Sequence, residues 1–155
     1  MNKFPCVELL LPHDAPMILI DKIIDVSKLT IHCQVEINAG GMFFDKQINA
    51  TPAWVGIEFM AQTVAAWSGY HAWLKKSPSP IGFLLGSRRY NSECDIYRSD
   101  QILDIYAEQL MENEGMSAFM CRIECEGKIL ASCQLNAFVP SADKLDEMLK
   151  RKEND

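Results

Sequence analysis

Hydrophobic and polar residues alternate along much of the chain, on both sides of one long apolar stretch. Strict alternation over 29–37 predicts a strand with one buried face, and the Ile-rich segment 17–26 before it predicts another. Beyond the apolar stretch the sequence predicts further strands at 81–91, 102–111, 117–125 and 129–139. Asn113-Glu114-Gly115 and Gly127-Lys128 are typical turn sequences, so the last three strands are predicted to form an antiparallel meander.

The apolar stretch predicts a long helix from 52 to about 76. Thr51 supplies a capping hydroxyl, and Pro52 suits the first helical position. Glu58 is the only charged residue between 52 and 74, and a helix that is apolar all round has to be buried. A membrane span is the alternative, but the longest charge-free run is shorter than the roughly eighteen residues that a span needs. We therefore expect no membrane association.

The order of these elements predicts an α+β domain: two strands, one buried helix, then three or four antiparallel strands. The packing expected for this order is a sheet curled around the helix, the arrangement called the hotdog fold. A length of 155 residues suits one such domain, 1–155, in which 142–155 form a charged helical tail. Because such a sheet leaves edges open, we expect two edges to pair in a dimer.

Charge and cysteine content narrow the function classes. Fifteen basic against twenty-one acidic residues give a net charge of -6, which makes nucleic acid an unsuitable partner. The six cysteines form no CxxC pair and no zinc-ligand spacing, so we interpret them as buried thiols of a cytoplasmic protein without a metal site. The N-terminus lacks the pattern of a signal peptide.

Glu58 is the residue that the pattern leaves to be explained, because an ionised carboxylate on an apolar helix is costly unless it is paired. Burial would favour its protonated form and make it a proton donor near neutrality. Gln62, four residues further on, shares its helix face and is expected to orient the carboxyl. A carboxylate at the rim of the helix, capped or solvated, remains the alternative.

A proton donor beside a helix start suits chemistry next to a polarised carbonyl. The backbone N–H groups at 51–54 would hold a developing oxyanion while a base removes the proton α to a thioester. Glu58 would then protonate the departing 3-hydroxyl, which amounts to dehydration of a 3-hydroxyacyl thioester to a 2-enoyl thioester. This chemistry needs no cofactor, and the apolar helix and strands would line a tunnel for the acyl chain.

Three histidines are candidates for the base. His32 is expected to face solvent from the polar side of its strand. His71 lies about 220° around the helix from Glu58, so these two side chains face apart. His13, in a proline-rich loop, remains as the candidate base; its alternative role is to bond the backbone and fix the N-terminal segment.

Several segments resemble the 3-hydroxyacyl-acyl-carrier-protein dehydratases of fatty-acid synthesis. They are Leu11–Asp21, Phe43-Phe44, Pro52–Gln62, Gly82–Tyr90 and Asp100-Gln101. The resemblance covers roughly residues 5–140. Within it, the sequence around 52–69 is most similar to the branch of the family found with aryl polyene pigment synthesis, a polyketide-like pathway. It implies a hotdog fold, an acyl carrier protein carrying a 3-hydroxyacyl chain as partner, and an active site formed across a dimer interface.

The resemblance also assigns roles to residues. It implies that Glu58 is the catalytic acid and that Gln62 is the glutamine of the same motif. The backbone amide near Ala53 and Trp54 falls where the family binds the thioester carbonyl, although the usual glycine of the family is here Ala53. His13 matches a histidine that the family carries in addition to its base.

The family's base is a histidine in a Gly-His-Phe-Pro loop before the helix, and this sequence has no histidine over 45–51. We therefore predict the acid-bearing subunit of a dehydratase, heterodimeric with a histidine-bearing paralogue that supplies the base. A homodimer in which His13 is the base stays open. Two other classes also stay open: a hotdog acyl thioesterase, and a non-catalytic subunit that shapes a partner's acyl tunnel.

A carrier protein is usually strongly acidic, so local basic pairs are candidates for its docking. Lys75-Lys76 and Arg88-Arg89 are such pairs in an otherwise acidic chain. The hypothesis is that they attract the carrier protein electrostatically, in a salt-sensitive way. Ordinary solvated charges are the alternative interpretation of both pairs.

Overall fold

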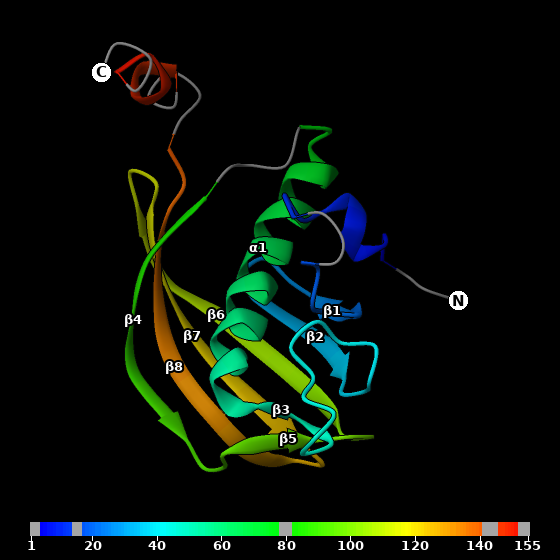
Figure 1. Ribbon diagram of the computed structural model, residues 1–155. Coiled ribbons are helices and arrows are strands. Elements are labelled where there is room, and N and C mark those ends of the chain that lie inside the picture. The colour runs from blue at the N-terminus through cyan, green and yellow to red at the C-terminus, as the bar shows by residue number, and fades with distance from the viewer. Residues whose placement is uncertain (1–3, 14–16, 78–81, 141–145, 152–155) are drawn as a thin grey trace.

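A single long helix, enclosed by a strongly curved antiparallel sheet, forms the centre of the computed structural model (Figure 1). The structure describes residues 4–13, 17–77, 82–140 and 146–151. The helix is α1 (Gly56–Leu74), and the sheet has six strands in the order β1-β2-β6-β7-β8-β4. These strands are β1 (Lys22–Val26), β2 (Thr30–Glu36), β4 (Phe83–Ser92), β6 (Ile102–Asn113), β7 (Met116–Cys125) and β8 (Lys128–Phe138).

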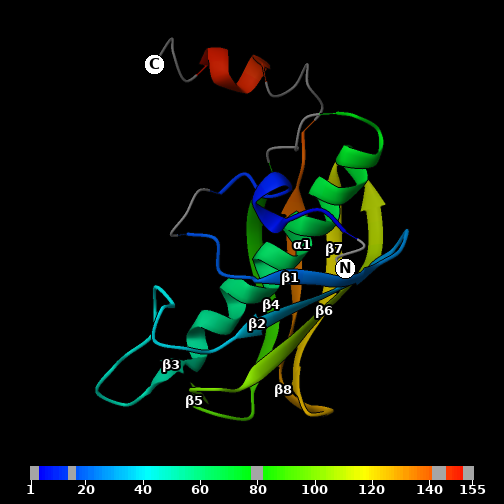
Figure 2. The ribbon, with the colours of Figure 1, turned by 90° about the vertical axis from the view of Figure 1, so that its right-hand side faces the viewer.

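The predicted α+β hotdog fold is confirmed. Figures 1 and 2 show the sheet curling around α1, so that its inner face packs against the helix. Alternate residues of the strands are buried on that face, as the pattern predicted. The largest fully buried apolar side chains in this core are Leu10, Ile20, Met60, Tyr97, Leu103, Ile105, Ile123 and Leu135.

The two hairpins of the predicted meander close through tight turns. Glu114 and Gly115 both have positive φ, 52° and 88°, and Glu126 and Gly127 have φ of 51° and 80°. Two consecutive residues with positive φ are typical of the two-residue turns that match the twist of antiparallel strands. The turns therefore fix the register of β6, β7 and β8.

The predicted start of the helix is wrong. Thr51 and Pro52 belong to a short strand, β3 (Ala50–Pro52), which pairs with β5 (Ile96–Arg98) in a second, two-stranded sheet. A 3-10 turn, η2 (Ala53–Val55), follows, and α1 begins at Gly56 without a side-chain cap. The predicted cap fails because pairing with a strand some 45 residues away draws Thr51 out of the helix.

The N-terminal segment packs directly on the helix. We call residues 4–13 and 17–21 the N-terminal arm; it contains the 3-10 turn η1 (Val7–Leu9). Both views place this turn beside the C-terminal half of α1 (Figures 1 and 2). A Cβ atom at Gly69 would overlap the carbonyl oxygen of Leu10 and lie 2.8 Å from its carbonyl carbon. The arm can approach α1 this closely because Gly69 has no side chain.

The cysteines are only partly the buried thiols that the sequence predicted. All six are free; Cys33, Cys121 and Cys133 are buried, whereas Cys6 is exposed. Burial raises the pKa of the Cys33 thiol to about 12, so this side chain stays protonated and packs as a small apolar group. The prediction of burial is wrong for Cys6 because only one face of the N-terminal arm covers the core, and Cys6 lies on the other face.

Two further expectations concern the membrane and the C-terminal tail. Among the described residues, the helices lack the combination of length and apolar character that crossing a membrane requires. Residues 146–151 of the predicted tail are helical and exposed. The rest of that tail, 142–145 and 152–155, lies outside the described residues, as does the loop 14–16.

Gly69→Ala is expected to destabilise the protein by about 2 kcal/mol, because the new methyl group would push the arm away from α1. This net loss combines a packing cost of about 3 kcal/mol with a gain of about 1 kcal/mol in helix propensity. The melting temperature is expected to fall by roughly 4–8 °C. Gly86→Ala is the matched control, because a Cβ atom there meets nothing within 4 Å. Equal melting temperatures for both variants would contradict the close packing at Gly69.

Candidate active site

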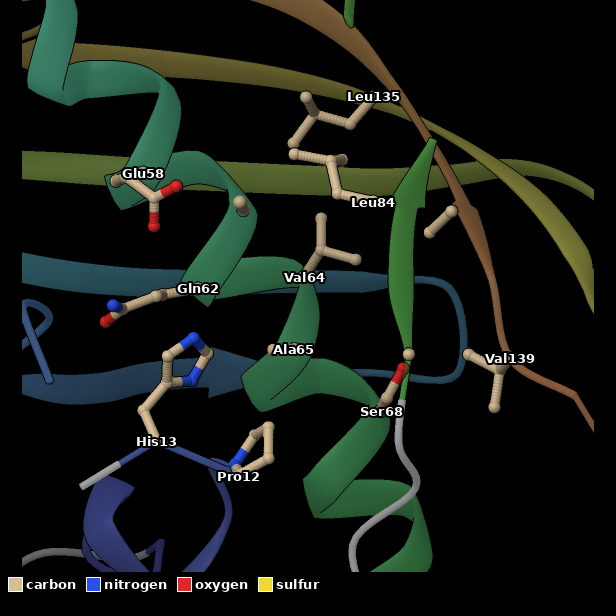
Figure 3. Close-up of a pocket in the computed structure, with 13 residues that line it drawn as sticks. Pro12, His13, Glu58, Gln62, Val64, Ala65, Ser68, Leu84, Leu135 and Val139 are labelled. Atoms are coloured by element: carbon tan, nitrogen blue, oxygen red, sulfur yellow. The ribbon is translucent and has the colours of Figure 1, made fainter. Parts of the chain in front are cut away.

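A pocket of about 180 Å³ lies between α1, the N-terminal arm and the strands β4 and β8 (Figure 3). One side of it carries the predicted polar groups, Glu58, Gln62 and His13. The other walls are mostly apolar and come from Pro12, Ala61, Val64, Ala65, Leu84, Leu135, Ala137 and Val139, with Ser68 and Gly82. An apolar pocket with a few polar groups on one side is typical of a small-molecule site.

Glu58 lies in the first turn of α1 and lines this pocket. The sequence predicted a buried carboxyl, and the structure finds it half-buried, because the pocket opens beside it. Within the described part of the chain, the carboxyl has no hydrogen-bond or ion-pair partner. Its oxygens are therefore available to a ligand in the pocket.

Gln62 is 1% exposed and does not orient the Glu58 carboxyl, contrary to the expectation from their spacing. Its Oε1 accepts a hydrogen bond of 2.8 Å from the Leu19 backbone N–H, and its Nε2 donates one of 2.6 Å to the Met17 carbonyl. Both polar ends of the amide are thus bonded to the N-terminal arm. The expectation failed because the arm, 43 and 45 residues away in sequence, competes for the amide.

His13 lies in the same pocket, next to Gln62 in the view of Figure 3. The side chain is half-buried, and its buried Nδ1 has no hydrogen-bond partner among the described residues. A buried polar atom without a partner is uncommon and costs free energy. The structure therefore brings the acid candidate and one imidazole to a single pocket, from segments far apart in the sequence.

Ala53 and Trp54 lie outside this group of residues. The Ala53 N–H donates a hydrogen bond of 2.9 Å to the Asp95 carbonyl, so it is not open to a thioester oxygen. This is a correction to the expected oxyanion site, and its cause is the short β3–β5 sheet beside the turn. Trp54 is 60% exposed and packs edge-on against Phe43, with ring centroids 5.6 Å apart. A carbonyl-binding role for the Trp54 amide remains a prediction.

The other two histidines lie away from the pocket. The prediction that His32 faces solvent is wrong in part: Nε2 lies 2.7 Å from Asp104 Oδ1, and the ring stacks on Tyr106 at 4.2 Å. His71 Nε2 lies 2.9 Å from the Ser27 carbonyl oxygen. Within the described ranges, no three His, Cys, Asp or Glu side chains are grouped as metal ligands would be.

A tyrosine of β4 bonds to the turn that precedes the helix. The Tyr90 hydroxyl donates a hydrogen bond of 3.0 Å to the Ala53 carbonyl oxygen. The pKa of Tyr90 is raised, mainly by burial, so this hydroxyl keeps its proton through neutral pH. This bond and the Asp95 contact hold the turn that leads to Glu58.

Tyr90→Phe is expected to cost about 1 kcal/mol of stability, because the Ala53 carbonyl loses its donor while the ring packing is kept. Thermal unfolding followed by circular dichroism measures this loss. Tyr106→Phe is the control, since Tyr106 makes ring contacts with His32 and Arg122 that phenylalanine retains in large part. If Tyr90→Phe were as stable as the parent chain, the bond to Ala53 would have no role in fixing the turn.

The fold and the pocket define a hotdog protein with a carboxyl and an imidazole in an apolar pocket. The sequence model of the ApeP-like family, described as ApeP dehydratase, matches residues 5–150, and this chain belongs to that family. A solved chain of the dehydratase heterocomplex ApeI:P from Xenorhabdus doucetiae is 32% identical, with a TM-score of 0.86; the match covers 95% of this chain and 99% of that one.

One more distant relative is also a dehydratase, and another shares only the fold. The 3-hydroxyacyl-[acyl-carrier-protein] dehydratase FabZ of Deinococcus radiodurans is 23% identical over 81% of this chain and 85% of its own length. A hypothetical thioesterase from Streptococcus pneumoniae TIGR4, solved with coenzyme A, is 12% identical over 77% of this chain and 85% of that one, with a TM-score of 0.60; this likeness shows the fold alone. The predicted membership in the dehydratase family, close to the ApeP branch, is confirmed.

Proposed function

We propose that this chain dehydrates 3-hydroxyacyl thioesters on acyl carrier protein to trans-2-enoyl thioesters, with Glu58 as the general acid. The observation that carries the proposal is the position of Glu58: a half-buried carboxyl without a described partner, in a pocket whose other walls are mostly apolar. Membership in a dehydratase family supports the reaction class. The apolar walls suit the acyl chain, and the carboxyl suits the 3-hydroxyl.

In the proposed reaction, a base removes one proton from C2 of the acyl chain. The electron pair of that C–H bond forms the double bond between C2 and C3 as the C3–O bond breaks. Glu58 donates its proton to the leaving oxygen, which departs as water, and the base returns its proton through solvent to Glu58. Atoms and charges balance without a cofactor or a metal ion.

We propose that the base is a histidine of a paralogous partner subunit. The loop 45–51, where the family carries its base, has no histidine in this chain. The solved relative with 32% identity is part of a dehydratase heterocomplex. Among the described residues, one edge of β4 is unpaired in the six-stranded sheet, and this strand carries Leu84 and Leu85, which are 48% and 54% exposed. An open edge with exposed apolar residues favours pairing with a second subunit.

A second candidate for the base is His13, within this chain. The unpartnered Nδ1 of His13 in the Glu58 pocket favours this alternative. A stand-alone dehydratase would then need no histidine from a partner. The two proposals share Glu58 as the acid and differ only in the source of the base.

Glu58→Gln is expected to reduce turnover of 3-hydroxyacyl carrier protein by about 10²- to 10⁴-fold, because the amide has no acidic proton to donate. The assay measures formation of the enoyl product, with the chain alone and with candidate partner subunits. Glu108→Gln, on an exposed position of β6, is the matched control and should leave turnover unchanged. Full activity of Glu58→Gln would contradict the proposal, as would release of free thiol without enoyl product.

His13→Ala separates the two sources of the base. If a partner supplies the base, the purified chain alone is inactive, and its complex with the partner keeps turnover within about 10-fold after His13→Ala. If His13 is the base, the chain is active alone, and the same substitution removes about 10²- to 10⁴-fold of its rate. Equal melting temperatures of the parent chain and of the His13→Ala variant would show that the substitution leaves the fold intact.

A further inference from the structure

Both polar ends of the Gln62 amide are bonded to the N-terminal arm. Gln62 is 1% exposed on a mostly apolar helix, where an unbonded amide would be costly. Its oxygen accepts from the Leu19 N–H and its nitrogen donates to the Met17 carbonyl, at 2.8 and 2.6 Å. The amide thus bonds one backbone donor and one backbone acceptor of the same short segment. A neighbouring strand in a sheet would hold the segment in the same way.

A second attachment joins the same arm to the same helix. At Gly69, about two turns beyond Gln62, the helix backbone contacts Leu10 so closely that no side chain fits between them. Val7, Leu10 and Leu11 of the arm are buried there. The arm is thus fixed at residue 10 and again at residues 17–19, and His13 lies between these two points.

We infer that Gln62 is a positioning residue: it holds the arm so that the His13 imidazole and Pro12 form one wall of the pocket opposite the acyl chain. This inference rests on the proposed function of the Glu58 pocket and deepens it. Gln62 follows Glu58 by one helical turn, so a single stretch of helix fixes both the acid and the wall that carries the imidazole. Gln62 also lines the pocket, and the inference is that its effect on the reaction runs through His13.

Removing the amide would release one of the two attachments. In Gln62→Leu, the Leu19 N–H and the Met17 carbonyl lose their partners while the apolar packing of the helix is kept. The arm then remains tied at Gly69 but can move at residues 17–19, which shifts His13 relative to Glu58. Displacement of a group at a reaction site by about 1 Å can cost about 10²-fold in rate.

Hydrogen exchange of the Leu19 amide tests the attachment without any activity. The inference predicts that Gln62→Leu raises the exchange rate of this amide at least about 10-fold, because its acceptor is removed. Thr63→Val is the matched control: Thr63 is the next residue, is fully buried, and its hydroxyl bonds within the helix to the Phe59 carbonyl at 2.8 Å. An unchanged exchange rate at Leu19 in Gln62→Leu would overturn the inference.

A double-mutant cycle tests the link to His13 in the active protein, with the partner subunit present where activity requires it. Gln62→Leu is expected to lower kcat/KM by no more than His13→Ala does in the same protein, and to lower it little or not at all in the His13→Ala background. Thr63→Val should lower kcat/KM by the same small factor in both backgrounds. A full, additive loss in the His13→Ala background would show that Gln62 acts on the substrate or on Glu58 directly, and would overturn the inference.

The two experiments keep this inference separate from the proposed function. If Glu58→Gln leaves turnover unchanged, the proposed function fails, yet Leu19 exchange still reports whether Gln62 fixes the arm. If Glu58→Gln abolishes turnover while Gln62→Leu leaves both Leu19 exchange and kcat/KM unchanged, the positioning role fails and the proposed function stands.

Discussion

The structure depends on the burial of a helix that has a single charged side chain over most of its length. A sheet that curls around α1 shields much of the helix from water, and the pocket beside Glu58 spares its carboxylate the full cost of burial. The packing of the helix therefore limits where a carboxyl can lie on it. Glu58 is half-buried beside this pocket near the start of α1, whereas Trp73 and Leu74 at the other end of the helix are 48% and 55% exposed.

The pocket is assembled from three parts of the chain that are distant in sequence. The helix supplies Glu58 and Gln62, the N-terminal arm supplies Pro12 and His13, and strands β4 and β8 supply apolar walls. The arm approaches the helix closely at Gly69, where no side chain would fit, and is hydrogen-bonded to the buried side-chain amide of Gln62.

Much of the fold was predictable because its signals are periodic and local. Alternation predicted the meander, and the charge-free run predicted the buried helix with Glu58 as its exception. The helix start was mispredicted, because Thr51 pairs with β5, a strand too short to have a period of its own. The hydrogen-bond partners of Gln62 and of the Ala53 amide could not be predicted either, because these bonds join residues about 40 positions apart in the sequence. Spacing within a helix shows which side chains share a face. It does not show which backbone groups from distant segments will hydrogen-bond to those side chains.

The most direct test of this account is a crystal structure with a substrate analogue, a 3-hydroxyacyl pantetheine in which an amide replaces the thioester. The protein would be the chain with its partner subunit, or the chain alone if it is active alone. The account predicts the 3-hydroxyl oxygen within about 2.6–3.2 Å of a Glu58 carboxyl oxygen, with the acyl chain against β4 and β8. An acyl chain bound in another hollow, or a 3-hydroxyl turned to bulk water beyond the reach of Glu58, would contradict it.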